Sequence, residues 1–449
     1  MNPVTAQRLQ GDFAVRRVHF IAFCCGLGSM LFVPTPFGRI AMFDLAAFAV
    51  VPFLLREVRK WGKPHRTLLG LSLLWLVSAV ATEMVLGDVP FVISLKGCMI
   101  IFNVFCMLVF GFAMITRSRY AMAWFLVGSG ISDVLSLYVF QNGALLSIAQ
   151  QAGGGFGGNI SGFLQERQVY PMYIWGFIFA CLLPLARKSI MPPFMVGICF
   201  LLVGILLLLV GSRSAFGVYA VSGVVTLVYV FDRNGLRRLF QNTFLVVILG
   251  GILGWGIFKA YEISAVRGWM GEGERAKYEL QIVESGVGAF GGRSDALYCI
   301  PFLIEHPIFG AGVFPIDRWG IVARVRDKHN WPDPPDEREK FIPGHSVFFG
   351  AWSQNGIGGG VFWLYALYLL LQFARKALIQ TAELFPIYFF CVASTFWAVL
   401  TAPFGGMRGY CCLLLCLCVV AVDDLRHWPR TSEGSAGRPV HPGQWARPT

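Results

Sequence analysis

Apolar stretches of roughly 20 residues recur from one end of the chain to the other, each long enough for an α-helix to cross a bilayer. Short polar segments separate them. The pattern predicts an all-α polytopic membrane protein with about twelve transmembrane helices. The predicted spans are 18–35, 40–56, 67–85, 90–115, 120–140, 170–186, 193–210, 215–231, 242–262, 347–373, 383–401 and 405–422.

Lys and Arg residues cluster after the even-numbered spans, and such clusters mark short cytoplasmic loops. We therefore predict a multi-pass inner-membrane protein with both termini cytoplasmic. The first apolar run ends in Pro34-Thr35-Pro36 rather than at a small-residue cleavage site, so it is interpreted as an uncleaved helix and not as a signal peptide. The clusters are Arg56 to Arg66, Arg117 with Arg119, Arg187 with Lys188, Arg233 to Arg238, and Arg375 with Lys376.

This topology divides the chain into five parts. Residues 1–17 form a cytoplasmic N-terminus, 18–262 carry helices 1 to 9, 263–345 form a large periplasmic loop, 346–422 carry helices 10 to 12, and 423–449 form a disordered cytoplasmic tail.

The large loop has two different segments. Prolines between Trp331 and Asp336 predict exposed irregular backbone there. The apolar residues between Arg293 and Ile304 predict a short helix near the membrane interface, kinked at Pro301.

Composition supports a membrane protein, because 56% of the residues are hydrophobic and only 14% are charged. The net charge of +12 lies in short clusters between apolar stretches, which does not favour a nucleic-acid partner. All cysteines except Cys299 fall in apolar stretches, where thiols act as small hydrophobic groups. The group Cys411, Cys412, Cys416 and Cys418 lacks the paired spacing of a zinc site, so we predict helix packing there, no metal and no cofactor.

Two arginines on the predicted outer side are candidate phosphate ligands. Arg213 lies in the tight turn 211–214 before span 8, where free N–H groups at the helix start attract an anion. The alternative is an interfacial arginine that marks a helix end. Arg293 follows two glycines, and its guanidinium could grip a phosphate in bidentate fashion or be solvated in the loop.

His345 is the candidate general base, because Ser346 is expected to cap the next helix and the field at that end keeps an imidazole neutral. The alternative is a neighbour of the cap without a chemical role. Lys96 and Asp44 are ionisable residues near the outer ends of their spans, where they could pair, or Lys96 could hold an anionic headgroup.

The loop acids Glu305 and Asp317 could orient His345 or a sugar, although solvated roles at the surface are the simpler interpretation.

A longer pattern joins these residues. His345 and Ser346 are followed by nine residues, Val347 to Asn355, and then by Gly356-Ile357-Gly358-Gly359. This pattern resembles the His-[Asn/Ser/Gln]-x9-Gly-x-x-[Gly/Thr/Tyr] signature of O-antigen ligases.

Two upstream segments resemble the same superfamily of O-antigen ligases and polymerases. Gly211 to Ala215 is similar to its arginine turn, and His306 to Gly312 is similar to the segment that follows its loop arginine. The three motifs occur in the family's order.

The resemblance implies transfer of a glycan from undecaprenyl diphosphate to an acceptor hydroxyl on the periplasmic face, with inversion and without a metal. It implies a lipid A-core acceptor, or a second lipid-linked glycan if the protein is a repeat-unit polymerase of O-antigen or exopolysaccharide. His345 would be catalytic, Arg213 and Arg293 would bind the diphosphate, and Ser346 and Lys96 would support them. An alternative of another class is a transporter of lipid-linked glycans, which would need more charged groups in the middle of the membrane.

Overall fold

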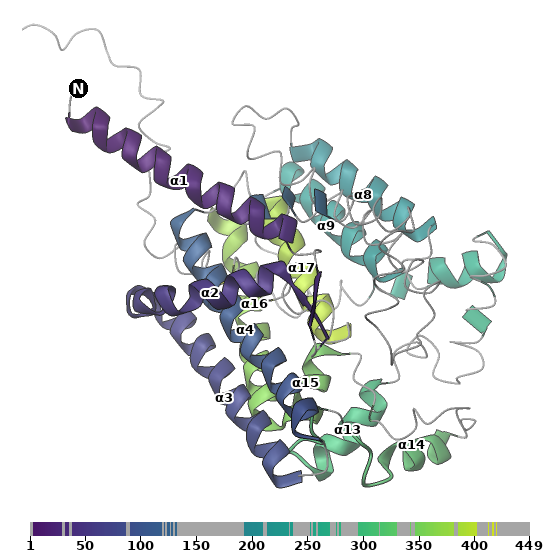
Figure 1. The fold of residues 1–449 in the computed structure, drawn as a ribbon. Helices are drawn as coiled ribbons and strands as arrows, with labels where there is room; N and C mark the ends of the chain where they lie inside the picture. Colours follow the sequence, from purple (N-terminus) through teal and green to yellow (C-terminus); the bar gives the residue numbers. More distant parts are fainter. Residues whose placement is uncertain are drawn as a thin grey trace, which may run out of the picture.

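The structure is a computed structural model and is mostly helical (Figure 1). It describes residues 3–28, 32–35, 38–86, 90–118, 193–209, 213–232, 259–269, 295–313, 315–329, 346–380 and 385–401, with scattered residues in 121–132, 234–236, 252–256 and 275–279, and at 342 and 412–419. The predicted spans 120–140, 170–186, 242–262 and 405–422, the irregular stretch 331–336 and the tail 423–449 lie wholly or largely outside these residues.

Several predicted spans coincide with helices. Among the helices that are described, α3 and α4 are long and apolar enough to cross a membrane. The helices at predicted spans are α3 (Lys63–Leu86), α4 (Phe91–Arg117), α8 (Pro193–Leu209), α9 (Arg213–Phe231) and α17 (Phe385–Thr401). The loop contains α13 (Asp295–Glu305), with Pro301 inside it as predicted, and α14 (Ile321–His329).

The first two predicted spans need correction. Helix α1 (Pro3–Gly28) begins earlier and ends earlier than the span 18–35, and the strands β1 (Phe32–Thr35) and β2 (Gly38–Ala41) pair antiparallel after it. Pro34 and Pro36 disfavour a helix through the last part of the predicted span, because proline removes a helical hydrogen bond and clashes with the preceding turn. The second span becomes α2 (Met42–Leu54) followed by the 3-10 helix η1 (Leu55–Lys60).

The predicted tenth span, 347–373, is two helices rather than one. Helix α15 (Val347–Asn355) ends at Gly356, and α16 (Ile357–Gln380) starts directly after it. Gly356 has φ 75°, outside the helical region and favourable for glycine, so the helix cannot continue through it.

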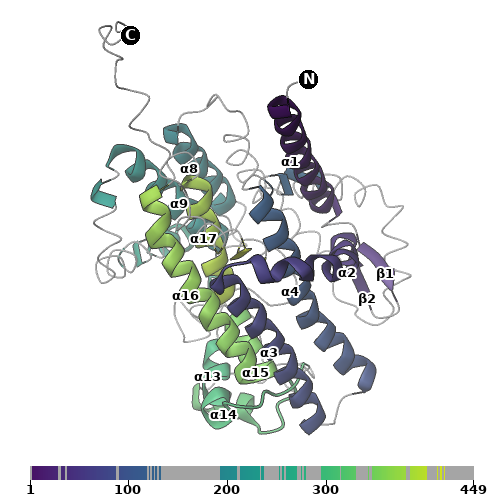
Figure 2. The ribbon, with the colours of Figure 1, turned by 90° about the vertical axis from the view of Figure 1, so that its left-hand side faces the viewer.

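The helices described by the structure form two packed groups. Helix α3 lies between α4 and α16, side by side with α16 (Figure 2). Helices α8 and α9 form a close pair in which a Cβ added to Gly223 would lie 2.9 Å from the Gly197 carbonyl oxygen. Helix α17 joins the groups, because it contacts both α9 and α16. The start of α9 is therefore held against the helices that follow the large loop.

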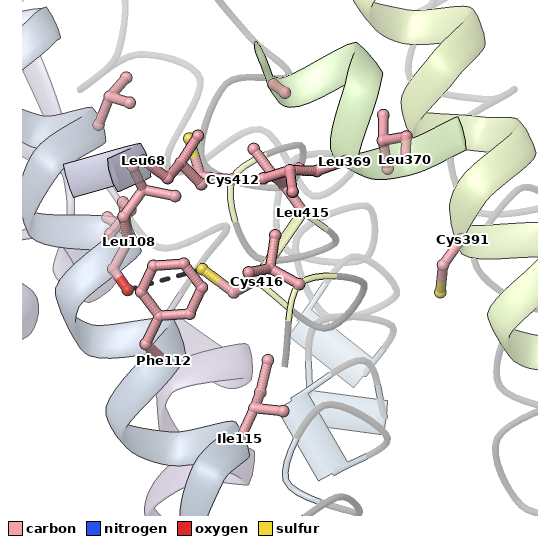
Figure 3. Packing of buried hydrophobic residues seen from close by; sticks show 14 of the residues in the cluster. Leu68, Leu108, Phe112, Ile115, Leu369, Leu370, Cys391, Cys412, Leu415 and Cys416 are labelled. Atoms are coloured by element: carbon pink, nitrogen blue, oxygen red, sulfur yellow. Dashed lines mark hydrogen bonds between the residues drawn. The ribbon is translucent and has the colours of Figure 1, made fainter. Parts of the chain in front are cut away.

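The predicted packing role agrees with the structure for Cys412 and Cys416, whereas Cys411 and Cys418 lie outside the described residues. Cys412 and Cys416 are fully buried, among Leu68, Leu108 and Phe112 (Figure 3). The Cys416 thiol donates to the Leu108 carbonyl at 3.6 Å.

Both faces of α3 are apolar. Trp75 and Ala79 face the core, whereas Val77, Met84 and Val85 are exposed. An exposed apolar face of this kind is typical of helices that contact lipid.

The connections between helices gather at two ends. At one end, Arg117 at the end of α4 forms an ion pair with Glu57 in η1, and His19 of α1 hydrogen-bonds Ser118 at 2.7 Å. At the other end, Glu83 near the end of α3 accepts from the Val313 backbone N–H at 2.6 Å. The second end carries the loop with α13 and α14 (Figure 1).

Candidate functional site

Ser346 caps α15, as the sequence predicts. It has an extended backbone, with φ -108° and ψ 128°, and its hydroxyl oxygen accepts from the Phe349 N–H at 3.3 Å. The same hydroxyl donates to the Val399 carbonyl of α17 at 3.2 Å. The buried serine therefore fixes the start of α15 to the end of α17.

The nine residues between the two halves of the signature are helix α15 itself. A Cβ added to Gly356 would lie 2.2 Å from the Ile308 carbonyl oxygen, and one added to Gly359 would lie 2.4 Å from the Ala351 carbonyl oxygen. Both glycines therefore allow a backbone approach that any side chain would prevent.

The segment His306–Gly312 docks on this junction, so two motifs that are separate in the sequence meet. A Cβ added to Gly310 would lie 2.2 Å from the Gln354 carbonyl oxygen, which shows how closely the segment approaches α15. Four hydrogen bonds fix the contact: Ala311 N–H to Ser353 O at 2.7 Å, Gly312 N–H to Gln354 O at 2.9 Å, Ile357 N–H to Ile308 O at 3.0 Å, and Trp352 Nε1–H to Pro307 O at 3.0 Å.

Helix α3 supplies side chains to the junction that the sequence analysis did not single out. The Trp75 indole N–H donates to Asn355 Oδ1 at 3.0 Å, and the Ser78 hydroxyl donates to the Asn355 carbonyl at 2.6 Å. Glu83 accepts from the Ser94 hydroxyl at 2.5 Å in addition to Val313. Glu83 is the single charged residue between Thr67 and Leu86, and that signal could have identified it.

Arg213 is the first residue of α9, and its side chain is not among the described ones. Helices α9 and α17 run antiparallel, because the ring of Tyr219 lies 4.8 Å from that of Phe390 and the ring of Tyr229 lies 4.1 Å from that of Phe385. The start of α9 is thus level with the end of α17.

The start of α9 and the end of α17 can be compared by their positions along the helix axes. At 1.5 Å per residue, Arg213 lies about 9 Å beyond Tyr219 and Val399 lies about 14 Å beyond Phe390, in the same direction. The backbone of Arg213 therefore stands at the same end of the bundle as the Ser346 contact to Val399.

The other predicted site residues are placed as follows. Arg293 and His345 lie outside the described residues. Lys96 is exposed on α4 beside Gly97, where an added Cβ would overlap Val313 of the loop. Asp44 is half-buried on α2, and its predicted pairing with Lys96 stays a prediction.

The two loop acids have structural roles. Asp317 accepts from the backbone N–H groups of Ile321 and Val322 at 2.9 and 2.7 Å, which caps α14. Glu305 pairs with Arg324 at 2.8 Å on the surface, and this hydrogen bond raises the pKa of Arg324.

Within the part of the chain that is described, no group of three or more His, Cys, Asp or Glu residues could hold a metal ion. No protein-family model matches the chain, and no curated protein matches it. The resemblance of its three motifs to O-antigen ligases therefore supports a proposal about function and does not assign a family.

Proposed function

We propose that the protein is an integral membrane glycosyltransferase that moves a glycan from undecaprenyl diphosphate to an acceptor hydroxyl on the outer face of the bacterial inner membrane. The lipid A-core is the proposed acceptor. The observation that carries the proposal is the direct contact between the His306–Gly312 segment and the junction of α15 and α16, because both belong to the ligase-like pattern.

The proposed reaction is a single displacement. His345 takes the proton from the acceptor hydroxyl, and the acceptor oxygen forms a bond to the anomeric carbon. The bond from that carbon to the diphosphate oxygen breaks, with inversion, and the polyprenyl diphosphate leaves. Arg213 and Arg293 stabilise the negative charge that grows on the leaving diphosphate.

The arrangement of the backbone supports this assignment. Ser346, which follows the proposed base in the sequence, donates to the Val399 carbonyl at the end of α17. The first residue of α9, Arg213, stands at that same end of the bundle. A base and an anion-binding arginine at one end suit a reaction at the level of the outer headgroups.

The membrane location rests on α3 and α4, which are long and apolar enough to span a bilayer, and on the apolar outer face of α3. Two contacts between connections support the proposed sides of the membrane. The ends of spans 2 and 4 meet through Glu57 and Arg117, and the connection after span 3 meets the large loop through Glu83.

The test is transfer by purified protein in vesicles that contain a synthetic undecaprenyl-diphosphate glycan and lipid A-core. Wild type is expected to give a product with the summed mass, and His345→Ala is expected to lower the rate by about 10²-fold or more. His329→Ala, a histidine of the same loop outside the signature, is the matched control and should retain the wild-type rate.

The same reaction distinguishes the other candidates. Lengthened glycan on the carrier, with no product on lipid A-core, would identify a repeat-unit polymerase, whose signature segments are similar. Movement of the donor across the vesicle membrane without any transfer would contradict the proposed chemistry and favour the transporter.

A further inference from the structure

Part of the large loop exposes a strip of apolar side chains. Ile304 is 76% exposed and Ile308 is 58% exposed, with Ile300 and Phe309 beside them at 44% and 47%. The opposite face of α13, with Phe302, is buried in the small core of the loop. Water is a poor solvent for such a strip.

Contacts to α3 set the depth of this strip. The Ile308 carbonyl accepts from Ile357, and Gly358, the next residue, lies against α3 where its added Cβ would be 2.6 Å from the Cβ of Ser78. From Ser78 to the end of α3 at Leu86 is about 12 Å at 1.5 Å per residue. Ile308 is therefore level with the body of α3 and not with its end.

The exposed apolar face of α3 continues past that level. Met84 is 81% exposed and Val85 is 65% exposed, both further along the helix than Ser78. If the face of α3 from Val77 to Val85 lies in hydrocarbon, the Ile308 level lies in hydrocarbon too.

The backbone of this part of the loop suits a site inside the membrane. Irregular backbone is tolerated at hydrocarbon depth only where its polar groups are satisfied by protein. The carbonyl groups of Pro307 and Ile308 and the N–H groups of Ala311, Gly312 and Val313 all have partners in α15, α16 or α3.

We propose that residues 300–309 form a re-entrant segment whose exposed apolar side chains, Ile300, Ile304, Ile308 and Phe309, contact lipid acyl chains of the outer leaflet, while the Glu305 carboxylate stays paired with Arg324 on the side toward α14. The inference rests on the membrane location in the proposed function. It places part of the loop below the headgroups, where the chain of a polyprenyl diphosphate also runs, while the polar helix α14 stays in water.

The test uses the full chain with photoreactive benzoylphenylalanine at one position, reconstituted in vesicles of phosphatidylethanolamine and phosphatidylglycerol. Ile304 and Phe309 are the test positions, Val77 on α3 is the lipid-facing control, and Lys328 on α14 is the solvent-facing control; all four are exposed. After irradiation, lipid adducts are measured by the mass of the intact protein. The yields at Ile304 and Phe309 are expected within about twofold of that at Val77 and at least about tenfold above that at Lys328.

Three outcomes would overturn the proposal. Adducts at Val77, with Ile304 and Phe309 no better than Lys328, would place the segment outside the bilayer and leave the membrane location standing. No adduct at any position, Val77 included, would contradict the membrane location as well. Protein dimers instead of lipid adducts at Phe309 would make the strip an interface between two copies of the chain.

Discussion

At the scale of single residues, the glycines of the ligase-like pattern have a steric reason. The backbone at Gly310 and at Gly356 lies so close to a neighbouring carbonyl oxygen that an added Cβ would be only 2.2 Å from it. The sequence marked these glycines only by their spacing. The structure shows why glycine is required there, because the two segments pack with their backbones in contact.

Gly356→Ala is expected to lower the free energy of unfolding by about 2 kcal/mol or more, because alanine is strained at positive φ and its Cβ would clash with the Ile308 carbonyl. Gly217→Ala in α9 is the matched control, since its added Cβ meets nothing within 4 Å. Thermal unfolding in detergent measures both. Equal midpoints for the two variants would show that the junction tolerates a side chain.

At the scale of elements, the helix break at Gly356 lets α15 turn across α16 and offer its last carbonyl groups to the loop. The sequence predicts the loop helix α13 and the cap at Ser346 well, because both depend on neighbours a few residues away. It does not predict the break in the tenth span, because neither a proline nor a charge interrupts 347–373, and the polar Ser353-Gln354-Asn355 before Gly356 is short enough to lie within one helix.

Glu83 of α3 accepts hydrogen bonds from α4 and from the large loop, so its substitution tests how the loop is held. Glu83→Gln leaves one acceptor oxygen for two donors, Ser94 and Val313, and is expected to speed hydrogen exchange of the Val313 amide by about tenfold. The control is Glu279→Gln, an exposed acid that pairs with Arg275 at i,i+4. Unchanged exchange at Val313 would mean that the carboxylate does not hold the loop.

At the scale of the whole molecule, the distribution of positive charge predicts which connections share a side of the membrane. The contacts of Glu57 with Arg117 and of Glu83 with Val313 group the helix ends in the same way. These two contacts agree with the predicted grouping of the helix ends, and the orientation of the helices in a membrane stays a prediction.

Reporter fusions test that topology. Alkaline phosphatase, which is active only after export, is expected to be active when fused after Lys328 in the loop and inactive when fused after Lys376. A cytoplasmic fluorescent reporter at the same two sites should give the opposite pattern. Active phosphatase at Lys376 would contradict the predicted orientation.

The sequence alone was enough to predict α3, α4, α8, α9, α13 and α17 and to find the ligase-like pattern, because hydrophobicity, caps and charge clusters act over a few neighbouring residues. Three arrangements are known from the tertiary structure alone: the His306–Gly312 segment lies on the α15–α16 junction, the start of α9 is at the same end of the bundle as the end of α17, and Glu83 binds the loop. These contacts join residues that are distant in the chain. Their energy depends on a partner that cannot be identified from the neighbouring residues in the sequence.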